Sequence, residues 1–132
     1  MAENVTPVVL KVKDFADREV MLVDYKFNQA TDTEGQVAGI VRGGQITIRV
    51  KALNDGNPEL LAWMLDPAAP HDLEVSFENT KDGSAMKTLK GTACYCVHFK
   101  EYWADDEEHY EEILLSCQKL ENGPVAYENP WK

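Results

Sequence analysis

The stretch QATDTEGQVAGIVRGGQ, residues 29–45, joins two segments of strand-like pattern with far more residues than a hairpin needs. Connections longer than about 12 residues without structure of their own are uncommon in compact domains, and they are usually functional or disordered. This one carries Val37, Ile40 and Val41 among its glycines, a composition unlike that of a disordered linker. An isolated monomer would have to leave these side chains on a projecting loop or fold them against something. We therefore expect the loop to contact another copy of the protein.

Two-residue periodicity on both sides of this loop predicts strands that are buried on one face. In residues 45–51, Ile46, Ile48 and Val50 alternate with polar side chains. Similar segments predict further strands over residues 8–12, 20–29, 73–78, 92–100 and 110–120.

One short helix is predicted over residues 58–65. Asn57 suits the N-cap, Pro58 suits the first helical position, and the Asp-Pro pair at 66–67 ends the helix. Its side chains leave almost no polar face, so we expect it to plug a barrel end or to pack against a sheet. The strands over 92–100 and 110–120 carry apolar residues on both faces, which indicates cover by this helix or by a neighbouring subunit.

The composition fits a single domain over residues 1–132. The formal net charge of -10 argues against nucleic acid or an anionic membrane as a partner. The N-terminal residues lack a basic region followed by an apolar core, and no apolar run approaches the roughly 20 residues of a membrane-spanning helix. We expect a cytoplasmic protein without a signal peptide.

The three cysteines, Cys94, Cys96 and Cys117, contain no C-x-x-C pair of the kind used in redox or zinc sites. Cys94 and Cys96 lie two residues apart on a predicted strand, so they share a face and are expected to act as small apolar residues. A redox or metal role is the alternative. The three histidines show no ligand spacing, and we expect no metal site.

The chain carries no motif that predicts catalysis: it has no G-x-S-x-G elbow, no P-loop and no H-E-x-x-H. The acidic run DDEEHYEE, residues 105–112, is predicted to be a solvated loop leading into the last strand rather than an acid and base pair. The glycines of the long loop do not open a helix as a phosphate-binding loop requires. We therefore predict no catalytic residue, no cofactor and no enzymatic activity.

Several short motifs follow one another in a recognisable order: DYKFNQ at 24–29, TD at 31–32, EGQVAGIVRGGQI at 34–46, ELLAWM at 59–64, MKTL at 86–89, YCV at 95–97, EY at 101–102 and YENPW at 127–131. In this order they resemble the Hcp tube proteins of type VI secretion systems, specifically the divergent branch also called TssD. The resemblance runs from about residue 8 to the C-terminus, and its most specific part is the glycine-rich loop that runs into RGGQI.

The resemblance implies a mainly β fold: a small antiparallel β-barrel of two sheets with one short α-helix and one long extended loop. It also implies hexameric rings that stack into a tube, which a contractile sheath expels together with a spike protein. The implied partners are the chain itself, the spike, the sheath, the baseplate and effector proteins carried in the lumen. Export would proceed through this machinery without a signal peptide, and the resemblance supplies no catalytic residue.

By similarity, the extended loop would reach an adjacent subunit or ring. Its expected contact residues are Thr31, Asp32, Glu34, Gly35, Gln36, Val37, Gly39, Ile40, Val41, Arg42, Gly43 and Gly44. Arg42 is the candidate for an ion pair with an acidic residue of the neighbour. The acidic run could face the lumen and select basic cargo, or face outward and meet the sheath.

Two other classes of protein remain open at this point. One is the tail-tube protein of another contractile injection machine, which would share the barrel and the ring. The other is a monomeric small-ligand β-barrel, which would need an apolar cavity.

Overall fold

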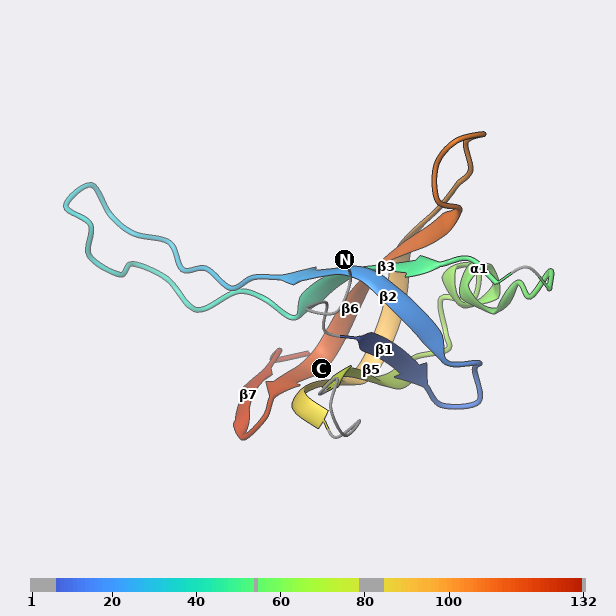
Figure 1. Ribbon diagram of the computed structural model, residues 1–132. Coiled ribbons are helices and arrows are strands. Elements are labelled where there is room, and N and C mark those ends of the chain that lie inside the picture. Colours follow the sequence, from blue (N-terminus) through green and yellow to red (C-terminus); the bar gives the residue numbers. More distant parts are fainter. Residues whose placement is uncertain (1–6, 54, 79–84, 132) are drawn as a thin grey trace.

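The computed structural model describes residues 7–53, 55–78 and 85–131. The first six residues, on which the expected absence of a signal peptide partly rests, lie outside the described part. The elements follow one another along the chain as β1 (Val8–Val12), β2 (Arg18–Tyr25), β3 (Gln45–Lys51), α1 (Glu59–Met64), β4 (His71–Glu78), β5 (Ala85–Tyr102), β6 (Tyr110–Asn122) and β7 (Val125–Glu128) (Figure 1). No helix among the described residues has the length and apolar character needed to cross a membrane.

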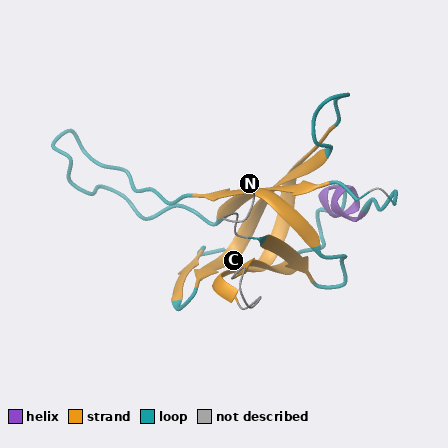
Figure 2. Ribbon diagram, in the orientation of Figure 1, coloured by secondary structure: helices purple, strands orange, loops and turns teal. Residues whose placement is uncertain are grey.

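The strands form one antiparallel sheet in the order β3-β2-β1-β4-β5-β6-β7. An additional pairing between β3 and β6 closes six of them into a barrel, with β7 attached outside the ring of six (Figure 2). The predicted mainly β barrel with one short helix is therefore confirmed. The two expected sheets are continuous with each other, because every neighbouring pair around the barrel is hydrogen-bonded.

Strand β6 closes the barrel, because it pairs with β5 on one side and with β3 and β7 on the other. Its first half pairs with β3, from Tyr110 opposite Lys51 to Ser116 opposite Gln45. Its last residues pair with β7 instead, from Lys119 opposite Glu128. Strand β5 lies along the other side of β6 and is longer than the sequence predicted, because it continues into the hairpin with β6 at one end and along β4 at the other.

Apolar side chains from the barrel strands and the helix fill the interior. The fully buried ones include Leu10, Ile46, Ile48, Val50, Leu60, Val75, Leu89, Cys94, Ile113, Leu115 and Cys117. A barrel packed in this way has its core where a lipocalin-like protein would hold a ligand. In the part of the chain that the structure describes, side chains occupy the barrel interior, which argues against the small-ligand alternative.

The two-sided apolar pattern of β5 has a local explanation. Cys94 and Cys96 share the buried face as predicted, whereas Val97 is 45% exposed. The register of β5 against β6 shifts between Cys96 and His98, and this irregularity returns Phe99 to the core side. An extra residue in one strand reverses the facing of all that follow. The outer face of β5 is therefore only partly covered within the monomer.

Helix α1 packs against β5 with Leu60 and Trp63 buried, while Leu61 on its outer side is 40% exposed. Trp63 meets the ring of Phe15 edge-on at a centroid distance of 5.7 Å and that of His71 at 5.1 Å. The helix thus packs against the sheet, one of the two positions expected for it.

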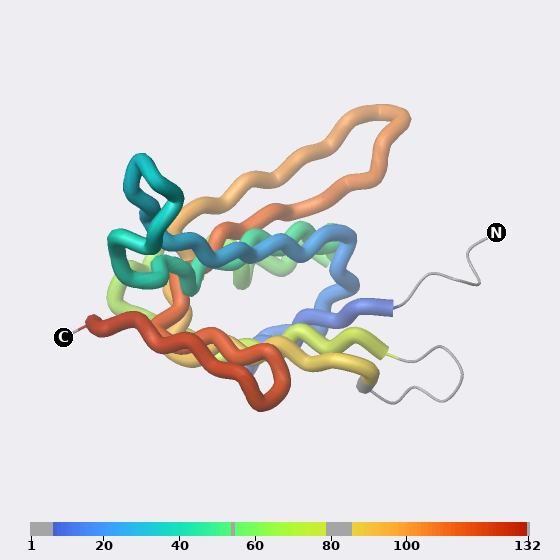
Figure 3. The backbone as a smooth tube through the Cα atoms, turned by 90° about the vertical axis from the view of Figure 1, so that its left-hand side faces the viewer, coloured from blue at the N-terminus to red at the C-terminus, as the bar shows by residue number. Residues whose placement is uncertain are grey.

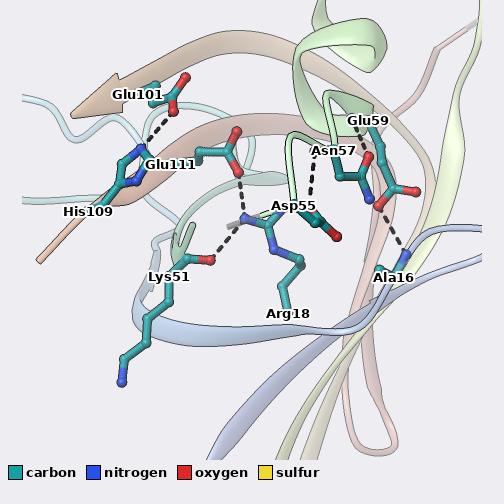
Figure 4. A network of polar contacts seen from close by, with 9 residues as sticks. All are labelled: Ala16, Arg18, Lys51, Asp55, Asn57, Glu59, Glu101, His109 and Glu111. Atoms are coloured by element: carbon teal, nitrogen blue, oxygen red, sulfur yellow. Dashed lines mark hydrogen bonds and ion pairs between the residues drawn. The ribbon is translucent and has the colours of Figure 1, made fainter. Parts of the chain in front are cut away.

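Polar contacts hold the helix end in place (Figure 4). The N-cap is Pro58, one residue later than the predicted Asn57, and the helix begins at Glu59. The Oδ1 of Asn57 still accepts a hydrogen bond from the backbone N–H of Glu59 at 3.0 Å. The carboxylate of Glu59 accepts one from the backbone N–H of Ala16 at 3.0 Å, which ties the helix to the β1–β2 turn.

A buried ion pair joins β2 to β6. The guanidinium of Arg18 donates to the carboxylate of Glu111 and also to the backbone carbonyl of Lys51, at 2.9 Å (Figure 4). Arg18 is 2% exposed and Glu111 is 7% exposed. The acidic run, residues 105–112, was predicted to be a solvated loop. That prediction is wrong for Glu111 and Glu112, which belong to β6, and only residues 105–109 precede the strand.

Candidate assembly surface

The long connection between β2 and β3, residues 26–44, projects from one end of the barrel as a narrow arm (Figure 1). Backbone hydrogen bonds link its two sides: Asn28 and Arg42 exchange two, at 3.0 and 2.8 Å, and the N–H of Ala38 donates to the carbonyl of Ala30 at 2.9 Å. The arm is therefore a hydrogen-bonded structure.

The tip of the arm is a turn organised by Asp32. Its Oδ1 accepts hydrogen bonds from the backbone N–H groups of Glu34 and Gln36, both at 2.9 Å. Between them lies Gly35 with φ of +84°, a conformation that favours glycine. Four of the predicted loop residues, Asp32, Glu34, Gly35 and Gln36, thus serve to shape the tip.

Apolar side chains on the arm are open to solvent. Val37 is 67% exposed, Ile40 is 63% exposed and Val41 is 36% exposed. Arg42 is exposed as well, and it forms no ion pair with any residue that the structure describes. Apolar residues gathered on a shaped, projecting segment are a feature of interaction surfaces.

Of the predicted contact residues, all but Gly43 and Gly44 are exposed, and these two lie at the base of the arm. A Cβ on Gly43 would lie 2.0 Å from Cδ1 of Phe27, so the absence of a side chain there lets the ring pack against the backbone. Gly44 has φ of +90°, and its carbonyl accepts a hydrogen bond from the N–H of Cys117 at 2.7 Å. These glycines join the arm to the barrel.

The C-terminal segment clamps the same base, which sequence reasoning did not predict. The side-chain amide of Asn129 donates to the carbonyls of Gly43 and Cys117, at 3.3 and 2.9 Å. The hydroxyl of Tyr127 lies 3.1 Å from the carbonyl of Val41 and 2.9 Å from Oδ1 of Asn129, so its single proton can go to either oxygen. The sequence motif YENPW, residues 127–131, contributed to the family resemblance, but nothing in it predicted a contact with the arm.

An apolar groove of about 560 Å³ runs beside the clamp. Its lining residues come from the end of β2, the arm base, β6 and β7 and are mostly apolar: Tyr25, Phe27, Val41, Leu120, Asn122, Val125, Ala126 and Tyr127. Phe27 and Tyr127 meet there with ring centroids 5.0 Å apart.

The β5–β6 hairpin is the second projection, and it extends away from the barrel in a different direction from the arm (Figures 1 and 3). Its neck is braced by the stacked rings of Tyr102 and Tyr110, 5.1 Å apart, with the guanidinium of Arg49 at 4.3 Å from the Tyr110 ring. Its loop exposes the side chain of Trp103 and the carboxylates of residues 105–108.

All three cysteines are buried free thiols. The hydrogen bond with Cys117 and burial raise the pKa of the Cys94 thiol, and burial raises the pKa of Cys96 to about 11. Cys94 and Cys96 are therefore poor nucleophiles in the folded protein. Within residues 7–53, 55–78 and 85–131, no group of three or more His, Cys, Asp or Glu side chains could hold a metal ion.

The barrel has a filled interior, and the ordered arm exposes apolar side chains. This combination is typical of a structural protein with an interaction surface. The family model described as hemolysin coregulated protein Hcp (TssD) matches residues 6–132. The chain belongs to the Hcp (TssD) family, whose members are the structural tube proteins of type VI secretion systems. No curated protein sequence matches the chain.

Solved structures agree with this family. Hcp1 from Flavobacterium johnsoniae is 30% identical, with a TM-score of 0.86 over 93% of this chain and 99% of that one. Hcp1 from E. coli EAEC 042 is 15% identical, with a TM-score of 0.74 over 96% of this chain and 100% of the other. The secreted protein Hcp3 from Pseudomonas aeruginosa is 13% identical, with a TM-score of 0.66 over 97% and 99%. The last two show likeness of fold alone.

Proposed function

We propose that this chain forms hexameric rings that stack into the inner tube of a type VI secretion system, with the arm reaching an adjacent subunit or ring. The observation that carries the proposal is the arm itself. It is ordered by its own hydrogen bonds and anchored at its base, yet it leaves Val37 and Ile40 in solvent. Contact with another copy would remove these side chains from water.

A ring supplies such a contact by geometry. In a cyclic assembly each copy presents one patch to a different patch on the next copy until the rotation closes. Stacking contacts can then be individually weak, since many identical ones act together along a tube. Arg42 lies exposed on the arm and has no ion pair among residues 7–53, 55–78 and 85–131, so it could pair with an acidic residue of a neighbour. The net charge of -10 offers many such partners.

The further partners follow from the family. The tube would carry a spike protein at its tip, be driven by a contractile sheath assembled on a baseplate, and hold effector proteins in its lumen. The subunits would be made in the cytoplasm and leave through this machinery without a signal peptide. Family membership and the filled barrel core support a structural, non-enzymatic role.

Native mass spectrometry of the purified protein, together with negative-stain images, tests the ring. We expect a species of six copies of the 14.9 kDa chain with a central hole in projection. A protein that stays monomeric at every concentration tested, with native circular dichroism, would contradict the proposal.

A further inference from the structure

Two of the buried thiols face each other across neighbouring strands. Cys94 on β5 lies directly opposite Cys117 on β6, and their Sγ atoms are 2.7 Å apart. A covalent S–S bond is about 2.05 Å long, so the sulfur atoms need to approach by only about 0.65 Å. Both residues are fully buried, and both are free thiols.

The backbone geometry suits a bond between them. Cys117 directs its N–H to the carbonyl of Gly44, and its carbonyl accepts from Asn129, so its backbone polar groups are used on the side away from β5. Directly opposite residues of this kind in antiparallel strands have Cα atoms about 4.5 Å apart. Disulfides accept Cα separations of roughly 4.4 to 6.8 Å. The pair therefore meets the backbone requirement without movement of either strand.

The packing around the pair is arranged to admit the sulfur atoms. A Cβ on Gly91 would lie 2.6 Å from Sγ of Cys94 and 3.2 Å from Sγ of Cys117. Any larger residue at position 91 would push the thiols aside. The third cysteine is not part of this arrangement, because the Sγ of Cys96 donates to the carbonyl of His98 at 3.4 Å.

We propose that Cys94 and Cys117 are an oxidation site, at which a disulfide-class oxidant such as oxidised glutathione converts the two thiols into a cross-strand disulfide that joins β5 to β6. One cysteine thiolate attacks the oxidant disulfide, forms a mixed disulfide and releases one glutathione thiolate. The second cysteine thiolate attacks the protein sulfur of that mixed disulfide and releases the other. Two electrons pass from the cysteine pair to glutathione, and the two thiol protons pass to the released thiolates or to solvent. This inference does not depend on ring or tube formation.

Burial determines when the bond forms. In the folded protein the thiols are closed to a bulky oxidant, so oxidation takes place as the chain folds or when β5 and β6 open locally. Once formed, the bond is buried and shielded from reducing thiols for the same reason.

The test starts from the denatured, reduced full chain, refolded in glutathione buffers of increasing oxidised fraction. Each sample is then denatured, its remaining thiols are alkylated, and they are counted by intact mass and located by peptide mapping. We expect one reactive thiol in the wild type and none in the matched control Cys96→Ala. We expect two in Cys94→Ala and two in Cys117→Ala. Three reactive thiols in the wild type under the most oxidising buffer, or a disulfide that contains Cys96, would overturn the proposal.

The melting temperature supplies a second readout that separates a native bond from a misfolded one. The oxidised wild type should retain the β-sheet circular dichroism spectrum and unfold at a temperature higher by on the order of 10 °C. An oxidised protein that melts at or below the temperature of the reduced protein would show that the native register does not accept the bond, and it would overturn the proposal as well.

Discussion

The ring of Phe27 packs against the backbone of Gly43, so closely that a Cβ at position 43 would lie 2.0 Å from Cδ1 of the ring. Phe27 in turn contacts Tyr127, which also reaches the carbonyl of Val41. One missing side chain thus allows the two sides of the arm base and the C-terminal segment to meet. We expect the direction in which the arm leaves the barrel to depend on this contact.

Substituting Gly43→Ala should therefore displace the Phe27 ring and misplace the arm. We expect a loss of about 1 to 3 kcal/mol in the free energy of unfolding and fewer rings and tubes in negative-stain images. The double variant Gly43→Ala with Phe27→Ala should recover part of the assembly, because the clash is gone. Normal assembly by the single variant would show that the arm tolerates movement of Phe27.

Removing the hydrogen bonds that Asn129 donates to the arm base should have an effect comparable to that of Gly43→Ala. Asn129→Ala leaves the carbonyls of Gly43 and Cys117 without their side-chain donor, at a cost of about 1 to 3 kcal/mol in urea unfolding. Asn122→Ala is the matched control, since its side chain makes one exposed hydrogen bond, to the hydroxyl of Tyr25, and should change stability by about 0.5 kcal/mol or less. Equal losses in the two variants would remove the special role of Asn129.

The apolar arm tip can be tested without disturbing the barrel. Val37→Ser combined with Ile40→Ser changes side chains that are 67% and 63% exposed, so the melting temperature should stay the same while ring stacking is lost. Deleting residues 32–41 should act likewise. Thr33→Ser, an exposed polar change on the same tip, is the control and should assemble normally. Tubes of wild-type length from the double serine variant would rule out the arm tip as a contact surface.

The helix is predicted to be integral to the fold. Trp63→Ala should lower the free energy of unfolding by about 3 to 5 kcal/mol, because Trp63 is 2% exposed and packs against Phe15 and His71. Leu65→Ala, at a site 71% exposed, should leave it nearly unchanged. Similar chemical denaturation curves for the two variants would show that α1 is peripheral.

The two ion pairs of β6 should differ in their contribution to stability. Glu111→Gln leaves the buried guanidinium of Arg18 without its counter-charge and should cost about 3 to 5 kcal/mol. Glu112→Gln breaks the pair with Arg49, whose side chain is 32% exposed, and should cost about 1 kcal/mol or less. Denaturant midpoints of both variants measure the difference, and a reversed order would contradict the assignment of Glu111 as the buried partner.

Local pattern was sufficient for part of the fold. Strand β3 has the predicted bounds because Ile46, Ile48 and Val50 alternate strictly with polar residues. Strand β7 was missed, since it has four residues and pairs only with the end of β6. Glu111 points inward like Ile113 and Leu115, two and four residues further along β6. Its burial was not predicted, because the neighbouring residues are also acidic and the whole run has the composition of a solvated loop.

The candidate surface was predictable only in its projecting part. A long loop with apolar residues is visible in sequence, and so is the glycine content of its base. The contact of Asn129 with the arm base is not, because Asn129 and Gly43 are 86 residues apart in the sequence and meet only in the folded structure. The facing of Cys94 and Cys117 likewise depends on the register of β5 against β6, which periodicity alone does not give.

Closure of the barrel also affects how unassembled subunits behave at high concentration. Each of the six barrel strands has a partner on both sides, and among the described strands the four-residue β7 keeps a free edge. A crowded solution of subunits therefore offers only a short template for sheet growth between chains. Under the proposed function, polymerisation would follow the geometry that the arm permits. We expect such subunits to stay unaggregated at high concentration. We also expect them to add to a growing tube once a nucleus is present.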